Sequence, residues 1–271
     1  MYIFTCVDLL SVPVHKRLEA DFYADPHIYD VLHHSGTASE VRCILRIARA
    51  LIPATAPMNI LEPACGSGRC PIALARKGHT CYGFDFSESM VQYAQAAARK
   101  GGLEDRCTFF TADMRDFDRK QKLPKFHLAF NLINTIRHLS SDAAVIDHFA
   151  CIKRHLAPGG IYIVGLSLCA YGFEAETEDV WSGKSPSIQV TQVVQYIPPP
   201  GSEGKARTEQ VLSHMTVKSS STETHIDSTY TLRGYNLTQW RDIVRNGGLQ
   251  IAGEFSSEGE PHEAAEPGYF L

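Results

Sequence analysis

The sequence predicts an α/β protein with a doubly wound, mostly parallel sheet, N-terminal helices and an inserted antiparallel β meander. Three observations lead to this prediction. Short apolar runs alternate with helix-like amphipathic runs over residues 59–167. The first of these apolar runs breaks into a glycine-rich turn just before a helical pattern. After Leu168 the apolar residues alternate with polar ones instead, which is typical of antiparallel strands.

The N-terminal residues 1–55 are expected to form a helical cap. They are polar and carry the turn-forming pair Asp25-Pro26. They end in a helical pattern over residues 38–51, whose apolar residues recur every three or four positions. That periodicity predicts a helix packed with one face on the sheet.

The sheet domain is predicted to cover residues 56–168 and 236–271. Its strands are predicted at 59–65, 80–85, 107–112, 127–132 and 160–167, and its helices at 69–77, 88–100 and 141–155. Ser87 and the run Ser140-Ser141-Asp142 mark the starts of two of these helices, because serine is a good N-cap residue. Strands that alternate with helices imply parallel pairing with right-handed crossovers.

The meander is predicted to lie within residues 169–235, as a lid on the sheet domain. Its strands are expected at 188–196, 207–218 and 223–233, with a break at the run Pro198-Pro199-Pro200-Gly201. A helix within 235–248 and a strand at 249–255 should follow. The final residues 269–271 are only a remnant of a last strand, which is therefore either clipped or replaced by the acidic tail around residue 258.

The glycine-rich turn is the first candidate for chemistry. Gly66 and Gly68 leave the main chain open to a ligand, and Glu62 stands in the strand before them. Asp85 ends the next predicted strand, where an acid can accept hydrogen bonds from both hydroxyls of a ribose. A nicotinamide dinucleotide would fit such a pair, but Pro71 follows where a third glycine is usual. A ligand with a short zwitterionic tail fits these residues better.

Four ordered motifs resemble those of the class I S-adenosylmethionine-dependent methyltransferases, which have a Rossmann-like fold. They are Glu62–Gly68, Gly83–Met90, Thr111–Met114 and Leu156–Gly160. The resemblance covers about residues 55–170 and implies S-adenosyl-L-methionine as the cofactor. It implies cofactor contacts from Glu62, Ala64, Gly66, Gly68, Asp85, Phe86, Met90, Asp113, Met114 and Asn131.

The resemblance also implies a role for several of these residues. Glu62 would face the ammonium group of the cofactor, and Asp85 would hold the ribose. Asp113 would accept the exocyclic amine of the adenine. Each has a structural alternative: Glu62 could pair with an arginine, Asp113 could cap a turn, and Phe86 and Met90 could belong to the core.

The segment 126–139 lacks the N-P-P-Y motif of DNA and protein-glutamine methyltransferases and is more similar to small-molecule N-methyltransferases. By this resemblance His138 is the candidate base, and a surface or capping histidine is the alternative. The predicted acceptor-binding residues are Tyr29, Asn134, Arg137, Tyr171, Trp181 and Arg233. Tyr23, Tyr196 and Tyr230 are further aromatic candidates near the acceptor.

Composition bounds the remaining choices. The 271 residues carry a net charge of -4 without a basic run, so a small-molecule acceptor is expected rather than a nucleic acid. The eight cysteines, Cys6 among them, form no C-x-x-C pair, and the twelve histidines show no ligand spacing, so no metal site is predicted. The chain shows neither a long apolar stretch nor a basic leader, and a cytoplasmic protein is expected.

Two other functions remain open: a nicotinamide-dependent oxidoreductase, and a catalytically silent protein that binds the same cofactor. The sequence also leaves open the identity of the acceptor, the choice between nitrogen and oxygen, and a homodimer.

Overall fold

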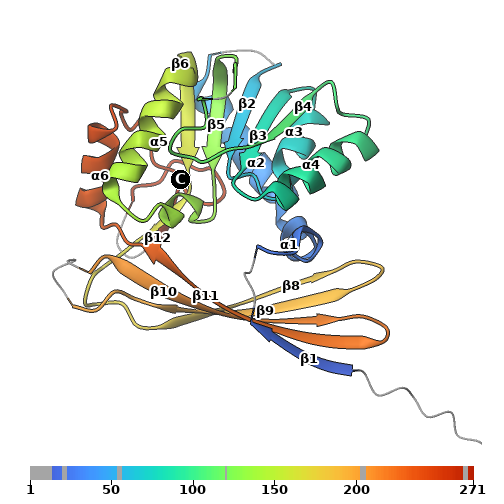
Figure 1. Ribbon diagram of the computed structural model, residues 1–271. Coiled ribbons are helices and arrows are strands. Elements are labelled where there is room, and N and C mark those ends of the chain that lie inside the picture. The colour runs from blue at the N-terminus through green and yellow to red at the C-terminus, as the bar shows by residue number, and fades with distance from the viewer. Residues whose placement is uncertain (1–13, 20–22, 54–56, 120, 202–205, 265–267) are drawn as a thin grey trace, which may run out of the picture.

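The computed structural model describes residues 14–19, 23–53, 57–119, 121–201, 206–264 and 268–271. The expectations for the first residues, including Cys6, lie outside these ranges. Figure 1 shows two layered parts: an α/β domain with helices on both faces of its sheet, and a separate antiparallel sheet beside it. In the part of the chain that the structure describes, no helix is long and apolar enough to cross a membrane.

The α/β domain has a five-stranded parallel sheet in the order β4-β3-β2-β5-β6. Its strands are β2 (Asn59–Pro63), β3 (Thr80–Asp85), β4 (Cys107–Thr111), β5 (Phe126–Asn131) and β6 (Leu156–Val164). This confirms the predicted doubly wound fold. The chain runs outward from β2 to β4 and then returns to β5 on the other side of β2, so the order of the strands reverses between β2 and β5. In sheets of this kind, ligands bind at that crevice, beyond the carboxyl ends of the strands.

Helices cover both faces of the sheet (Figure 1). One face packs on α2 (Thr37–Leu51), α3 (Arg69–Ala75) and α4 (Glu88–Lys100), and the other on α5 (Asp142–His155), with α6 (Leu237–Asn246) beyond it. The predicted caps are present: the side chain of Ser87 accepts a hydrogen bond from the Met90 N–H, and Ser141 accepts one from Ala144. These caps fix where α4 and α5 begin, and α4 starts just after the end of β3 at the crevice.

The inserted residues form an antiparallel meander, as predicted. It comprises β8 (Thr177–Lys184), β9 (Gln189–Ile197), β10 (Thr208–Lys218) and β11 (Thr222–Arg233). Two of its features were not expected. β8 was not predicted as a strand, because its polar, glycine-containing stretch shows little alternation. In addition, β1 (Val14–Glu19) from the N-terminal segment pairs in parallel with β11. The N-terminal segment therefore contributes a strand as well as helices α1 (Pro26–His33) and α2.

The C-terminal region differs from the prediction. Residues 249–255 form no strand, and Phe255 makes only an isolated bridge with Pro261. The Phe255 N–H donates to Leu271 O, and the Leu271 N–H donates back. The last strand is short: it is β12 (Gly268–Phe270), which pairs with β7 (Leu166–Leu168). Residues 249–255 therefore contact Leu271 through Phe255 and do not add a strand to the parallel sheet.

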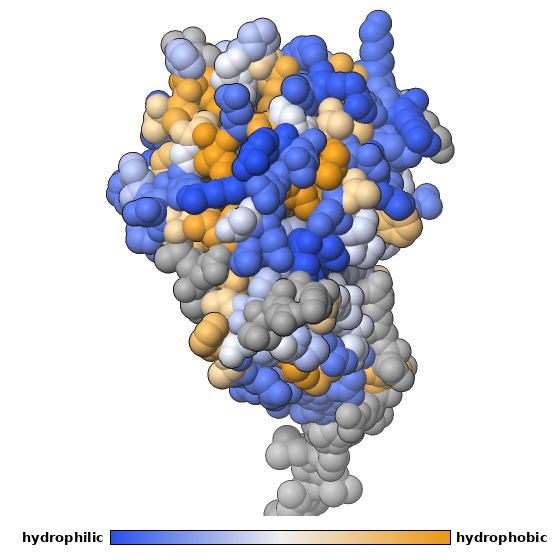
Figure 2. All heavy atoms as spheres, turned by 90° about the vertical axis from the view of Figure 1, so that its left-hand side faces the viewer, coloured by the Kyte–Doolittle hydropathy of each residue, from blue (hydrophilic) through white to orange (hydrophobic). Residues whose placement is uncertain are grey.

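A second cavity of about 430 Å³ lies where that strand was expected. It is bounded by β6, α6 and residues 248–255. Figure 2 shows this side of the molecule, with apolar groups gathered between polar ones over the α/β domain and a mostly polar surface over the antiparallel sheet.

Candidate active site

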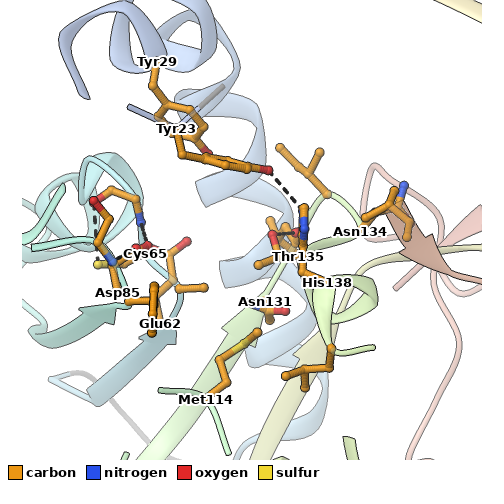
Figure 3. Close-up of a pocket in the computed structure, with 18 of the residues that line it drawn as sticks. Tyr23, Tyr29, Glu62, Cys65, Asp85, Met114, Asn131, Asn134, Thr135 and His138 are labelled. Atoms are coloured by element: carbon orange, nitrogen blue, oxygen red, sulfur yellow. Dashed lines mark hydrogen bonds between the residues drawn. The ribbon is translucent and has the colours of Figure 1, made fainter. Parts of the chain in front are cut away.

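The candidate site is a cavity of about 590 Å³ between the carboxyl edge of the parallel sheet and the antiparallel sheet. The ends of β2, β3 and β5 supply one side, and β8, β9 and β11 supply the other. Figure 3 shows Glu62 and Asp85 on one side of this cavity and His138 across from them, with Tyr23 and Tyr29 above. The inserted sheet therefore lies against the crevice where the parallel sheet would bind a ligand.

The backbone is strained at both strand ends that flank the crevice. Ala64 follows β2 with a φ of 49°, and Ile133 and Asn134 follow β5 with φ of 52° and 60°. Residues other than glycine rarely adopt such angles, and when they do they cluster at functional sites. All three of these residues line the cavity.

Asp85 is tied to the glycine-rich turn. One carboxylate oxygen accepts a hydrogen bond from the Gly66 N–H at 2.9 Å, and the other accepts one from the Ser87 N–H at 2.9 Å. Burial raises the pKa of Asp85, and these backbone donors partly oppose the rise. Its carboxylate thus faces the cavity from a fixed position.

The two glycines of the turn have different surroundings. Gly66 has a φ of 52° and lines the cavity, with Tyr29 directly above it. Gly68 has a φ of 74°, and a Cβ there would lie 2.8 Å from the Cβ of Ala94. Gly68 is not among the cavity-lining residues, so its place in the structure is explained by the close packing of α3 on α4.

Glu62 and Asn131 carry two buried acceptor oxygens at the crevice. Neither Glu62 Oε2 nor Asn131 Oδ1 has a hydrogen-bond partner among the described residues. Asn131 Nδ2 donates to Pro63 O at 2.8 Å, so the Oδ1 atom of Asn131 points away from Pro63. Burial raises the pKa of Glu62 well above its usual value. Leaving such acceptors unpaired costs free energy, and a cationic donor would satisfy both.

An arginine near Glu62 is already paired elsewhere. Arg69 NH2 lies 2.6 Å from Glu40 Oε2, and Arg69 NH1 donates to Thr37 Oγ1. Arg69 and Glu40 also line the cavity, and neither was predicted from the sequence. The ion pair joins α2 to the start of α3, and no sequence motif signals a contact between residues so far apart.

Only some of the residues predicted to contact the adenine of the cofactor line the cavity. Phe86, Asp113 and Met114 line the cavity, and the ring of Phe86 is 81% exposed. Both oxygens of Asp113 are held by Arg115, whose hydrogen bonds lower the pKa of that carboxyl group. Met90 is 1% exposed and not among the lining residues, so it belongs to the interior.

His138 lies on the acceptor side of the cavity, on the short helix η2 (Thr135–His138). Its Nε2 is 3.1 Å from the hydroxyl of Tyr23, and its ring stacks on Tyr230 at a centroid distance of 5.5 Å. Tyr29, Trp181 and Tyr196 also line this side. His33 and Gln192 line it too and were not predicted, because nothing in their own segments distinguishes them from core residues.

Three predicted acceptor residues lie outside the cavity lining. Arg137 is 2% exposed and pairs with Glu209 at 2.9 Å. Arg233 pairs with Asp142 at 2.8 Å, and the hydroxyl of Tyr171 donates to Gln239. Their polar groups are satisfied by partners brought in from other segments.

Asn134 lines the cavity, but its amide is engaged by Ser167: Asn134 Nδ2 donates to Ser167 Oγ, and the Ser167 N–H donates to Asn134 Oδ1. Within the described ranges, no group of three or more His, Cys, Asp or Glu residues could hold a metal ion.

Residues 60–160, which contain the crevice and its strands, match the family model described as "Methyltransferase domain". This match assigns residues 60–160 to a methyltransferase domain. A related sequence is the putative methyltransferase YqeM of Bacillus subtilis (strain 168), which is 32% identical over 108 residues, 39% of this chain and 40% of YqeM. The chain thus matches less than half of this curated relative.

Solved structures resemble nearly the whole chain. An S-adenosylmethionine-dependent methyltransferase from Clostridium acetobutylicum ATCC 824 has a TM-score of 0.70 at 15% identity, covering 90% of this chain and 94% of that one. The sugar N-methyltransferase KedS8 from Streptoalloteichus sp ATCC 53650 has a TM-score of 0.68 at 18% identity, covering 100% and 97%. At these identities the likeness establishes the fold, and it includes the elements outside the methyltransferase domain.

Proposed function

We propose that this protein transfers a methyl group from S-adenosyl-L-methionine to a nitrogen or oxygen of a small metabolite. The observation that carries the proposal is the pair of unpartnered oxygens, Glu62 Oε2 and Asn131 Oδ1, beside the Gly66 turn. They suit the ammonium of the cofactor's methionine part. Asp85 suits its ribose, and Phe86 and Met114 suit its adenine.

When bound, the cofactor supplies a methyl group on a positively charged sulfur, which is a good leaving group. The protein then has to hold the acceptor atom in line with the methyl, and positioning of this kind contributes on the order of 7–11 kcal/mol. The strained strand ends at Ala64 and Asn134, together with the inserted sheet, provide a fixed frame for that alignment.

His138 is proposed as the base that takes the acceptor's proton, through Tyr23 or directly. An acceptor atom that gained the methyl group would still carry a proton, and that proton would need a base. The contact of 3.1 Å between Tyr23 Oη and His138 Nε2 gives one hydrogen-bonded route for that proton.

The acceptor is proposed to be small, because β8, β9 and β11 line the far side of a cavity of about 590 Å³ that the acceptor would share with the cofactor. We expect the antiparallel sheet and the segment at Tyr23 and Tyr29 to close over bound ligands and exclude water. The net charge of -4 supports a small-molecule rather than a nucleic-acid partner. A cytoplasmic location and a homodimer stay predictions.

Calorimetry with S-adenosylhomocysteine tests the cofactor assignment, and micromolar affinity is the expected result. Parallel titration with NADH addresses the oxidoreductase alternative, for which binding of NADH and indifference to S-adenosylhomocysteine would be the signature. Transfer of a labelled methyl group to any member of an amine and alcohol panel separates an enzyme from a silent binding protein. A protein that binds neither nucleotide would refute the proposal.

A further inference from the structure

The inserted sheet is anchored to the α/β domain at one end. At that end the chain enters β8 and leaves β11, and ion pairs add to these covalent links. Arg207 and Arg233 both pair with Asp142 of α5, at 2.7 and 2.8 Å, and Arg137 of η2 pairs with Glu209 of β10 at 2.9 Å. The opposite end, called the distal end below, carries the turns that follow β8 and β10. A movement of the inserted sheet would therefore pivot at the anchored end and displace the distal end most.

Helix α1 packs on the distal end (Figure 1). Its residues Val31 and Leu32 are buried in an apolar cluster with Val190 of β9 and Met215 of β10. The backbone of β8 lies directly against α1, because a Cβ on Gly183 would overlap the carbonyl oxygen of Val31. The strand β1, which precedes α1 in the chain, pairs with β11 of the same sheet. Since this packing is apolar and buried, α1 would move together with the inserted sheet.

On its other side α1 contacts the glycine-rich turn and α4 through the carboxylate of Asp30. Asp30 Oδ1 accepts a hydrogen bond from Ser67 Oγ at 2.8 Å, and Asp30 Oδ2 accepts one from the hydroxyl of Tyr93 at 3.2 Å. Ser67 is 1% exposed and stands between Gly66 and Gly68, so this carboxylate joins α1 directly to the turn. Asp30 is not among the cavity-lining residues, and it therefore acts on a ligand only through the elements that it connects.

Tyr29, the residue before Asp30, covers the place proposed for the methionine part of the cofactor. A Cβ on Gly66 would lie 3.0 Å from Tyr29 Cε1, so the ring lies directly on the turn. Tyr29 and Gly66 both line the cavity. A cofactor bound against Gly66 would lie beneath α1, and its exchange would require α1 to move away from the turn.

We infer that Asp30 is a positioning residue that latches α1, and with it the distal end of the inserted sheet, onto the glycine-rich turn. Breaking two hydrogen bonds to this one carboxylate would release the latch and leave the apolar packing of α1 intact. The latch would then set how fast the cofactor and its product enter and leave the cavity. This inference rests on the proposed function and adds to it the residue that controls closure.

Stopped-flow measurements on the full chain with S-adenosylhomocysteine test the latch. Trp181 lines the cavity, so its fluorescence provides the signal. Asp30→Ala removes both hydrogen-bond acceptors. We expect it to raise the association and the dissociation rate constants together, each by about tenfold or more, because hydrogen bonds to a charged group are typically worth at least that factor. Their ratio, the Kd, should change little. A variant that had only lost a binding contact would raise the dissociation rate constant alone.

Two further variants locate the effect. Tyr93→Phe keeps the ring and removes one of the two donors, so it should raise both rate constants by a smaller factor. Combined with Asp30→Ala it should add nothing further, because the bond that it removes is already lost. His27→Ala is the matched control, at an exposed position on the same helix, and should leave both rate constants unchanged.

The outcomes distinguish this inference from the proposed function. A wild-type protein that does not bind S-adenosylhomocysteine refutes the proposed function. If the wild type binds it, unchanged rate constants in Asp30→Ala, or a rise in the dissociation rate constant alone, overturn the latch and leave the proposed function standing. Should Asp30→Ala fail to fold, Tyr93→Phe decides, and unchanged rate constants in that variant overturn the latch.

Discussion

The carboxylate of Asp85 accepts a hydrogen bond from the backbone N–H of Gly66 at 2.9 Å and so joins the end of β3 to the turn that follows β2. The same carboxylate accepts from the Ser87 N–H, at the N-cap of α4. Asp85 therefore has two tasks: it holds the turn in place, and it presents its charge to the cavity. Its effect on a ligand cannot be separated from its effect on the turn.

Asp85→Asn should weaken both S-adenosylhomocysteine binding and the fold. Hydrogen bonds to charged groups are worth roughly 1.5–3 kcal/mol, so affinity should fall by about tenfold to a few hundredfold. The melting temperature should also fall, because the amide nitrogen of Asn cannot accept from Gly66 or Ser87. Calorimetry and thermal unfolding measure the two effects, with the exposed Asp105→Asn as control. Unchanged affinity would remove the ribose assignment.

Glu62 should couple cofactor binding to proton release. Burial raises the pKa of Glu62, so the carboxyl group holds its proton to a higher pH in the free protein. An ammonium beside it would favour the carboxylate and lower that pKa. Binding of S-adenosylhomocysteine should then release a proton below the free-state pKa, and the affinity should rise as pH rises toward it.

Calorimetry in two buffers of different ionisation enthalpy measures this proton release. Glu62→Gln should abolish it, and Glu88→Gln, at an exposed position on α4, should not. An equal proton release in wild type and in Glu62→Gln would rule out Glu62 as the ammonium partner.

The parts of the site that lie close to the motifs in sequence were predictable, and those that depend on distant pairing were not. Glu62, Asp85 and Asn131 end neighbouring parallel strands, and such ends meet at one edge of a sheet whatever surrounds them. Arg137 and Arg233 looked equally suited to a ligand in the sequence. Their acidic partners come from elsewhere in the chain, so only the structure reveals them.

The same distinction holds for the fold. The parallel strands are apolar because both faces of their sheet are covered, and this made them visible in the sequence. The polar strand β8 carries a weaker pattern, and the parallel pairing of β1 with β11 joins residues more than 200 positions apart. His33 and Gln192 line the cavity because of how α1 and β9 are placed against the parallel sheet, and nothing in their own segments signals that placement.

Stability should fall with acidity because of His148. Burial lowers the pKa of this fully buried imidazole to about 4, from a usual value of 6.5. Its ring bonds to Met114 O and to the hydroxyl of Tyr162. The unfolded chain takes up a proton below about pH 6.5 while the folded chain does not, so the free energy of unfolding decreases as pH falls toward 4.

For this single group the slope is at most about 1.4 kcal/mol per pH unit. Urea denaturation of wild type and His148→Gln between pH 7 and 4.5 provides the comparison. The variant is expected to be less stable at pH 7 and to show a shallower pH dependence, whereas His27→Gln, at an exposed position, should follow wild type. Parallel curves for wild type and His148→Gln would show that His148 is not the titrating group.

His138→Asn should reduce methyl transfer without affecting cofactor affinity. The imidazole lies across the cavity from Glu62 and Asp85, and its Nε2 contacts Tyr23 rather than a cofactor-side residue (Figure 3). Removal of a general base typically costs a factor of about 10² to 10⁴ in turnover. The acid limb of the pH profile of kcat/KM, which protonation of His138 would cause, should disappear in the variant.

Tyr23→Phe tests whether the proton passes through the tyrosine, because it keeps the aromatic ring and removes only the hydroxyl. If Tyr23 relays the proton, this variant should lose turnover but keep the acid limb, since His138 remains. If Tyr23 only orients the imidazole, turnover should fall less than in His138→Asn and KM should be unchanged.

For the His138→Asn variant, His27→Asn, at an exposed position on α1, controls for the loss of a histidine. Full turnover with an unaltered acid limb in His138→Asn would leave His138 as a packing partner of Tyr23 and Tyr230.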